Sequence, residues 1–332
     1  MQYSMRTVKE NIKKNYRFQE LLAKSKQRRY RKQKKTKEYC KKSIERREAV
    51  LSREYPLNQM RKRRKLFPVL LFLMKCRLAL CGVKIRLLNT FERKSIAEPV
   101  IFVPTHIGKF DIEVVYACIK THALLLSGTE DRMHGTMDGW FLGKCGVNYV
   151  DRANKMDRAN SVIKMQKDLE HGFDLLWFIE GTWNLSENRL LYPVSWASVK
   201  LAGKCNATII PIGLNQLGKE IYVKFGEPVR ISKEQDCFEA ILDLKDVLAT
   251  LKWDIFEYMK EVREDGFIVR SELKENYWSE YLEERISEWP ITDLEEEMKY
   301  VFQPKGVYEA EEVFAPIRTL EVKKGNAFLW RK

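Results

Sequence analysis

The chain has 332 residues, 45% of them hydrophobic, which is enough for a packed core in one large domain or two modest ones. Its formal net charge of +14 is concentrated in residues 1–66, where 24 Lys and Arg stand against 6 Asp and Glu. That segment carries +18, so the remainder sums to −4. The basic character therefore belongs to an arm and not to the folded body, which excludes a uniformly basic domain.

The cysteines and the hydropathy pattern predict a cytoplasmic protein without a spanning helix. The 7 cysteines are scattered, odd in number and without metal-ligand spacing, so we expect reduced thiols and no metal. The basic start lacks the apolar run of a signal peptide. The longest strongly apolar stretch covers residues 66–74, well short of the ~20 residues that a bilayer requires.

Two basic segments open the chain. Residues 1–66 are predicted to form a polybasic N-terminal arm, because runs of Lys and Arg cannot bury a core. Residues 67–92 combine large apolar side chains with basic flanks, which predicts an amphipathic helix in a membrane interface. Anionic lipid would attract it by about 1 kcal/mol per cation. The alternative is that this helix covers one face of the core.

Residues 93–262 are predicted to form an α/β layered domain. Apolar, strand-like runs alternate here with helical stretches, which is typical of a central, mostly parallel or mixed sheet flanked by helices. The expected strands are 99–105, 123–127, 147–151, 175–179, 208–214 and 221–225, and the expected helices are 111–120, 137–144, 155–171, 194–204 and 234–262.

The last segment, residues 263–332, carries 16 acidic and 11 basic residues with interleaved aromatic residues. Because aromatic residues are rare in disordered segments, we expect an acidic helical C-terminal extension. It contains no recognisable functional motif.

A histidine and an aspartate follow the first strand of this domain. On one continuous helix His106 and Asp111 would diverge, since five positions rotate by about 140°. They can meet if His106 ends the strand and Asp111 begins the next helix, with Gly108 permitting the bend. Asp111 would then fix the imidazole tautomer and leave the other ring nitrogen free to take a proton. No serine or cysteine nucleophile stands beside the pair, so the base would act on a substrate hydroxyl directly. The alternative is a purely structural pair, which the position after a strand and the three later motifs disfavour.

Three further motifs follow the pair, each near the end of an expected strand: residues 148–152, 178–182 and 209–212. With residues 105–111, and in this order, they resemble the glycerolipid acyltransferases, the family that includes 1-acylglycerol-3-phosphate acyltransferase. The resemblance covers roughly residues 67–230. It implies that His106 and Asp111 are a catalytic dyad, in which His106 deprotonates an acceptor hydroxyl that attacks an acyl thioester.

The resemblance also implies an acceptor site. Arg152, in the Asp-Arg of the second motif, would bind an anionic headgroup through its planar fork of donors. Glu180 would bind acceptor hydroxyls or position Arg152. Gly181 would allow close approach of the backbone, and Thr182 completes the motif.

The chain departs from the family pattern at several positions. Thr105 stands where Asn is usual, and Trp183 where an Arg is usual after the Glu-Gly-Thr motif; a basic residue after the second strand is also missing. Lost cations weaken a phosphate site, since each charge-assisted bond contributes roughly 1.5–3 kcal/mol. Lys109 or Arg132 could compensate. Trp183 could instead stack on a sugar or a larger headgroup.

The sequence therefore predicts a membrane-associated O-acyltransferase of phospholipid biosynthesis, peripheral on the inner face of the membrane. It would move a fatty acyl group from acyl-CoA or acyl carrier protein to a lysophospholipid such as 1-acylglycerol-3-phosphate, without cofactor or metal. One alternative is the same chemistry on a glycolipid or saccharide acceptor. Another is a binding protein whose basic arm contacts nucleic acid or membrane, although the slightly acidic body and its lack of nucleic-acid motifs argue against nucleic acid.

Overall fold

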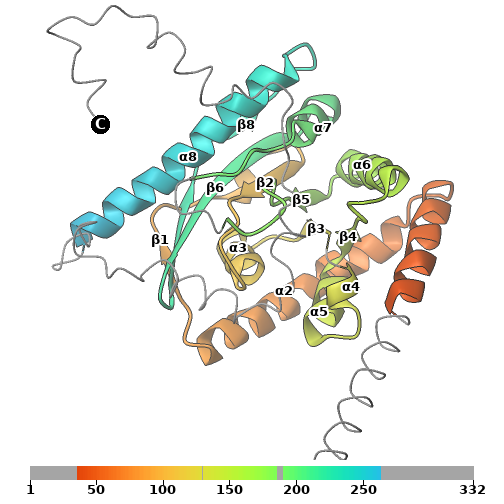
Figure 1. Cartoon of the computed structure of the whole chain (residues 1–332), viewed down its shortest axis with the longest axis horizontal. Coiled ribbons are helices and arrows are strands. Elements are labelled where there is room, and N and C mark those ends of the chain that lie inside the picture. The colour runs from red at the N-terminus through yellow and green to blue at the C-terminus, as the bar shows by residue number, and fades with distance from the viewer. Residues whose placement is uncertain (1–35, 129, 185–189, 263–332) are drawn as a thin grey trace, which may run out of the picture.

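The computed structural model describes residues 36–128, 130–184 and 190–262. The first part of the polybasic arm and the whole predicted C-terminal extension, residues 263–332, lie outside this range. Within it, helices surround one central sheet (Figure 1). A helix over residues 36–51 comes first and is followed by α2 (Leu57–Leu80).

The sheet is mixed, with eight strands in the described part of the chain. Seven follow the order β1-β7-β6-β2-β5-β3-β4, and β8 pairs with β6. Neighbouring strands are parallel except for the pairs β6–β7 and β6–β8. This confirms the predicted fold class. The strands are β1 (Lys84–Leu87), β2 (Val100–Pro104), β3 (Ala123–Ser127), β4 (Val147–Tyr149), β5 (Asp174–Leu176), β6 (Thr208–Leu217), β7 (Glu220–Phe225) and β8 (Val229–Arg230).

Helices cover both faces of the sheet, so its central strands are buried on both sides. Along β2 the side chains alternate between two core clusters: Val100 and Phe102 join one, and Ile101 and Val103 the other. The first cluster is covered by α2, α3 and α5, the second by α6, α7 and α8. The remaining helices are α3 (Asp111–Ile119), α4 (Glu130–Met133), α5 (Met137–Cys145), α6 (Lys155–Glu170), α7 (Ala197–Cys205) and α8 (Cys237–Val262).

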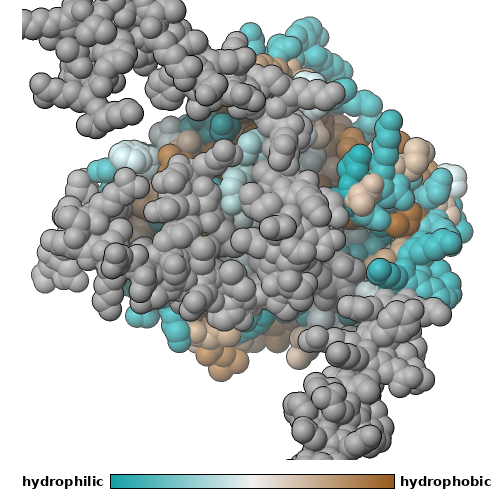
Figure 2. Space-filling model, viewed as in Figure 1, coloured by the Kyte–Doolittle hydropathy of each residue, from teal (hydrophilic) through white to brown (hydrophobic). Residues whose placement is uncertain are grey.

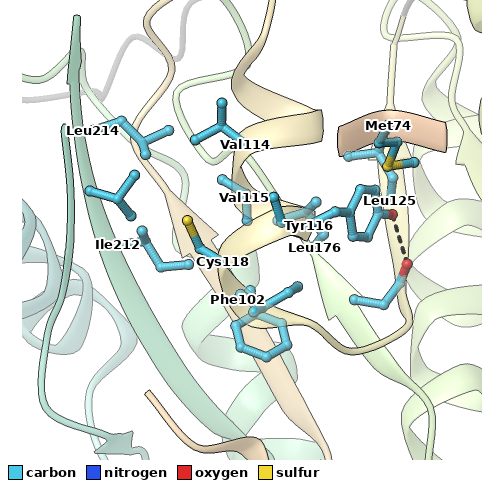
Figure 3. Packing of buried hydrophobic residues seen from close by; sticks show 14 of the residues in the cluster. Met74, Phe102, Val114, Val115, Tyr116, Cys118, Leu125, Leu176, Ile212 and Leu214 are labelled. Carbon is cyan, nitrogen blue, oxygen red and sulfur yellow. Dashed lines mark hydrogen bonds between the residues drawn. The ribbon is translucent and has the colours of Figure 1, made fainter. Parts of the chain in front are cut away.

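Helix α3 is the wall behind the start of the site. Figure 3 shows Val114, Val115 and Tyr116 of this helix packed among side chains of the sheet and of α2. The Tyr116 hydroxyl donates to the carbonyl oxygen of Ala123 at 2.8 Å, which satisfies a fully buried polar group. The helix is thereby fixed against the sheet, and with it Asp111 at its first position.

The predicted boundaries of the interface helix are wrong. Helix α2 begins at Leu57, inside the predicted arm, because Lys and Arg are good helix formers and can continue the periodicity of the apolar residues around them. It ends at Leu80, before Gly82, whose φ of +71° suits glycine. Residues 84–87, expected to continue the segment, form the edge strand β1, which pairs with β7.

Helix α2 has features of both predicted roles, a helix that covers the core and a helix that lies in a membrane interface. One face of α2 is buried in the core through Met60, Phe67, Leu70, Met74 and Leu78. The opposite face leaves large apolar side chains exposed, at Leu66, Val69, Phe72, Leu73 and Leu80. Figure 2 shows hydrophobic surface at the lower edge of the molecule, where Figure 1 places the end of α2. In the described residues, no helix is both long and apolar enough to span a bilayer.

Candidate active site

His106 and Asp111 meet as their spacing predicted. β2 ends at Pro104, His106 lies two residues further on, and Asp111 is the first residue of α3. Nδ1 of His106 lies 2.6 Å from Oδ2 of Asp111. The same carboxylate accepts hydrogen bonds from the backbone N–H of Ile107 at 2.7 Å and of Gly108 at 3.0 Å. Because both backbone N–H groups can only donate, buried Asp111 fits as a carboxylate, and a carboxylate at this distance favours the tautomer with a proton on Nδ1 of His106.

Thr105 anchors this loop to the neighbouring strand. Its N–H donates to the carbonyl oxygen of Ile212 at 3.0 Å, and its hydroxyl oxygen accepts from the N–H of Leu214 at 2.9 Å. Both partners belong to β6. The threonine in place of the usual asparagine therefore has a defined structural role, because it extends the β2–β6 ladder up to His106.

Two aromatic rings hold the imidazole of His106. The ring centroid of Phe178 lies 4.5 Å from that of His106, and the ring of Trp183 meets it edge-on at 6.4 Å. The His106 side chain is 18% exposed, so it is reachable while its orientation is restricted. Sequence reasoning gave Phe178 no role, although its place in the third motif, after β5, was a usable signal.

Glu180 supports the main chain of His106. Its Oε1 accepts from the N–H of His106 at 3.0 Å, while Oε2 accepts from the N–H of Tyr192 at 3.0 Å and from the side-chain amide of Asn184 at 3.2 Å. The N–H of Asn184 donates in turn to the carbonyl oxygen of His106. Burial raises the pKa of Glu180, and Lys252 together with the N–H groups of Tyr192 and His106 opposes the rise. Both carboxylate oxygens have protein partners, and the predicted contact with acceptor hydroxyls stays a prediction.

Arg152 reaches the third motif through the backbone. Its guanidinium donates to the carbonyl oxygen of Gly181 at 2.8 Å. The second and third motifs therefore meet through a main-chain oxygen, and not through the Glu180 carboxylate that was predicted to position Arg152. Gly181 has a φ of +73°, a conformation that favours glycine. Thr182 is partly exposed and is not among the described residues that line the adjoining cavity.

The site opens into a cavity of about 880 Å³. The polar part of its lining includes His106, three cations (Lys109, Arg152 and Arg158) and Trp183. The side chain of Arg132, the other candidate cation, lies outside the described part of the structure. The apolar part is lined by α2, α3, β3 and α5, through Leu73, Met74, Ile112, Leu125, Met133, Met137, Phe141 and Leu142.

The apolar part of the cavity borders the exposed face of α2. Leu73 and Met137 line the cavity and are also solvent-exposed, at 42% and 80%. Arg77 stands on the same wall and pairs with Glu113 and Asp138. An amphiphile could therefore place its polar head at His106 and its chain between α2 and α5. Among the described residues no group of His, Cys, Asp and Glu is arranged to hold a metal ion.

Comparison with known protein families matches residues 83–215 to the family described as Acyltransferase. No curated protein sequence matches the chain significantly. Among solved structures the chain is similar to the crystal structure of PlsC, the 1-acyl-sn-glycerophosphate (LPA) acyltransferase from Thermotoga maritima. That similarity has a TM-score of 0.46 and 14% identity, covering 57% of this chain and 79% of that chain.

Residues 83–215, which match the acyltransferase family, contain the His106–Asp111 pair, Arg152 and Glu180. This match confirms the family and the enzyme class, acyltransferase, that the order of the motifs predicted.

Proposed function

We propose that this acyltransferase moves a fatty acyl group from a thioester, acyl-CoA or acyl carrier protein, to a hydroxyl of a lysophospholipid. The observation that carries the proposal is the 2.6 Å contact between His106 and Asp111, with His106 in the wall of a cavity whose lining combines cations with apolar side chains. The cations suit the head of an amphiphile and the apolar side chains suit its chain. The reacting hydroxyl of a lysophospholipid lies between these two parts of the molecule.

The chemistry follows from the tautomer that Asp111 selects. With a proton on Nδ1, the Nε2 atom of His106 takes the proton of the acceptor hydroxyl while the oxygen attacks the thioester carbonyl carbon. The tetrahedral intermediate collapses with cleavage of the C–S bond. The leaving thiolate recovers the proton from Nε2, and His106 returns to its starting state. Neither a metal nor a cofactor is needed for this sequence of steps.

The cationic part of the cavity supports an anionic acceptor such as 1-acylglycerol-3-phosphate. Lys109, Arg152 and Arg158 line it, and a guanidinium can bind phosphate in a bidentate manner. The second candidate, a glycolipid or saccharide acceptor, is favoured by Trp183, whose indole lies beside His106 where the family usually has arginine. Aromatic faces stack on sugars, so the two candidates make different use of the same cavity.

The exposed face of α2 supports docking at a membrane, with the enzyme peripheral on its inner face. Val69 and Phe72 are 56% and 64% exposed, and the basic residues Arg61–Lys65 precede them on the same helix. An amphipathic helix of this kind binds interfaces by burying apolar side chains and by attraction to anionic lipid. F72D should weaken binding to anionic vesicles, whereas W253D on the distant α8 should leave it unchanged. Equal binding by both variants would contradict this surface assignment.

A headgroup panel tests the proposed function. A labelled fatty acyl thioester is offered with lysophosphatidic acid, other lysophospholipids and glycolipids, to the native protein and to H106A. A matched control is H171A, because His171 is exposed and far from the dyad in sequence. We expect turnover of lysophosphatidic acid that H106A abolishes and H171A retains. Turnover that depends on His106 but occurs only with glycolipids would show that the acceptor is a glycolipid and not lysophosphatidic acid. Turnover that does not depend on His106 would refute the mechanism.

A further inference from the structure

A buried lysine lies beside the site, on a helix outside the matched domain. Lys252 belongs to α8 and is only 6% exposed, although lysine is almost never fully buried without a partner. Helix α8 packs against β6 (Figure 1). The contact is close at Gly213, where an added Cβ would stand 2.8 Å from Cβ of Leu251.

This contact places α8 next to the anchor of the catalytic loop. Gly213 lies between the two residues of β6, Ile212 and Leu214, that bond to Thr105. Leu251 packs on that segment, and Lys252 is the next residue of the helix. The lysine is thus buried beside the strand that holds the residue preceding His106.

Two buried carboxylates, Asp111 and Glu180, bond to His106, and each is 1% exposed. Asp111 accepts from His106, Ile107 and Gly108, and Glu180 likewise accepts from three N–H groups. A protonated carboxyl would turn an O–H toward one of these donors, so the hydrogen bonds select the ionised forms. Two uncompensated negative charges at this depth would be costly.

Lys252 brings a positive charge into the same buried region. Burial lowers the pKa of Lys252, and the negative charges of Glu180 and Asp111 oppose that shift and favour the ammonium form. We propose that Lys252 is a positioning residue whose charge balances Glu180 and Asp111, so that His106 is neutral at rest and able to accept a proton. The catalytic part of this assignment rests on the proposed function; the charge balance does not.

The charge count explains why a base needs this lysine. With Lys252 protonated, the three buried groups Asp111, Glu180 and Lys252 sum to −1, and proton transfer from the acceptor hydroxyl to His106 brings this buried set to zero. The cations Lys109, Arg152 and Arg158, which line the cavity with His106, are the same with and without Lys252. Without Lys252 the buried set sums to −2, which favours an imidazolium at rest. An imidazolium has no lone pair on Nε2 and cannot act as a general base.

The test is the pH at which His106 titrates, followed by NMR of histidine-labelled protein and assigned with H106Q. Removal of a buried charge in K252M should move this titration upward by roughly one pH unit. The acid limb of the rate profile should move in the same direction, with K252R close to the native protein. K224M is the matched control, because Lys224 pairs with Asp254 on the same helix at 2.7 Å.

A folded K252M whose His106 titrates as in K224M would overturn the proposal. If K252M does not fold, the variant K252M/E180Q decides, since it removes one charge of each sign. The proposal requires this double variant to fold and its His106 to titrate near the pH at which His106 of the native protein titrates. A double variant no more stable than K252M would refute the proposal. The titration needs no substrate. If K252M shows the expected NMR shift but the native protein shows no acyl transfer, the proposed function is refuted and the charge balance by Lys252 stands.

Discussion

Replacing Asp111 by asparagine tests the dyad with almost no change of shape. Oδ2 of Asp111 receives Nδ1–H of His106 at 2.6 Å and the N–H of Ile107 at 2.7 Å, while Oδ1 receives the N–H of Gly108 at 3.0 Å. If the amide of D111N faces the imidazole, it donates to Nδ1 and drives the proton to Nε2. If it faces the other way, an N–H group opposes the N–H of Gly108.

Both orientations have a calculable cost. A wrong tautomer removes the base, and losses of about 10³- to 10⁴-fold in kcat, or about 4–5.5 kcal/mol, are typical for this kind of change. Charge-assisted hydrogen bonds contribute roughly 1.5–3 kcal/mol, and neutral ones about 1 kcal/mol. Since three are weakened and the buried charge is removed, we expect a net loss in the free energy of unfolding of about 2 kcal/mol.

The assay is the release of free thiol from an acyl thioester, with kcat and KM measured separately, and urea unfolding of the same preparations. The account predicts a fall in kcat with little change in KM, because Asp111 does not line the cavity. E113Q is a suitable control, since Glu113 lies on the same turn of α3 but pairs with Arg77 on the cavity wall. A kcat for D111N within tenfold of the native value would refute the reasoning.

Three further perturbations probe the frame around the site. G213A should lower the free energy of unfolding by about 1–3 kcal/mol, because its Cβ would overlap Leu251. The added Cβ of the control G143A meets no atom within 4 Å, so that variant should be neutral or stabilising. Thermal melts of the two variants make the comparison. R47M should cost about 3 kcal/mol in urea unfolding, because Arg47 binds buried Asp157 at 2.7 Å and also Glu130; an unchanged midpoint would contradict this. Burial raises the pKa of the Cys145 thiol to about 12, so at pH 8 a thiol reagent should label exposed Cys81 and leave Cys145 intact. Labelling of Cys145 as fast as that of Cys81 would contradict the burial of Cys145. Because the folded state favours the neutral thiol, the stability that Cys145 contributes should fall as the pH rises from 9 toward 12.

Elements with strong local signals could be predicted from sequence. The buried strand β2 reads as a continuous apolar run, and α6 shows helical periodicity, so both were found within a residue or two. Strand β1 was missed because it is an edge strand with charged residues at Lys84 and Arg86, and its pairing with β7 depends on residues 220–223. The start of α2 was missed because a basic run was interpreted as solvated arm.

The same division applies to the site. His106 and Asp111 are five positions apart, so the loop geometry between a strand and a helix was enough to join them. The partners of Glu180 could not be predicted, since Tyr192 and Asn184 reach it through the path of a loop. Lys252 is more than 70 positions beyond Glu180 in the sequence. Its relevance emerges only when α8 packs on β6, and no local pattern encodes that contact.

The role of His106 as the general base is tested most directly by the rate of acyl transfer from a labelled acyl thioester to lysophosphatidic acid. The rate is measured for the native protein and for folded H106A at saturating substrate. We expect a loss of about 10³-fold or more in kcat, with acceptor binding retained. Transfer by H106A at a rate comparable with that of the native protein would contradict this role.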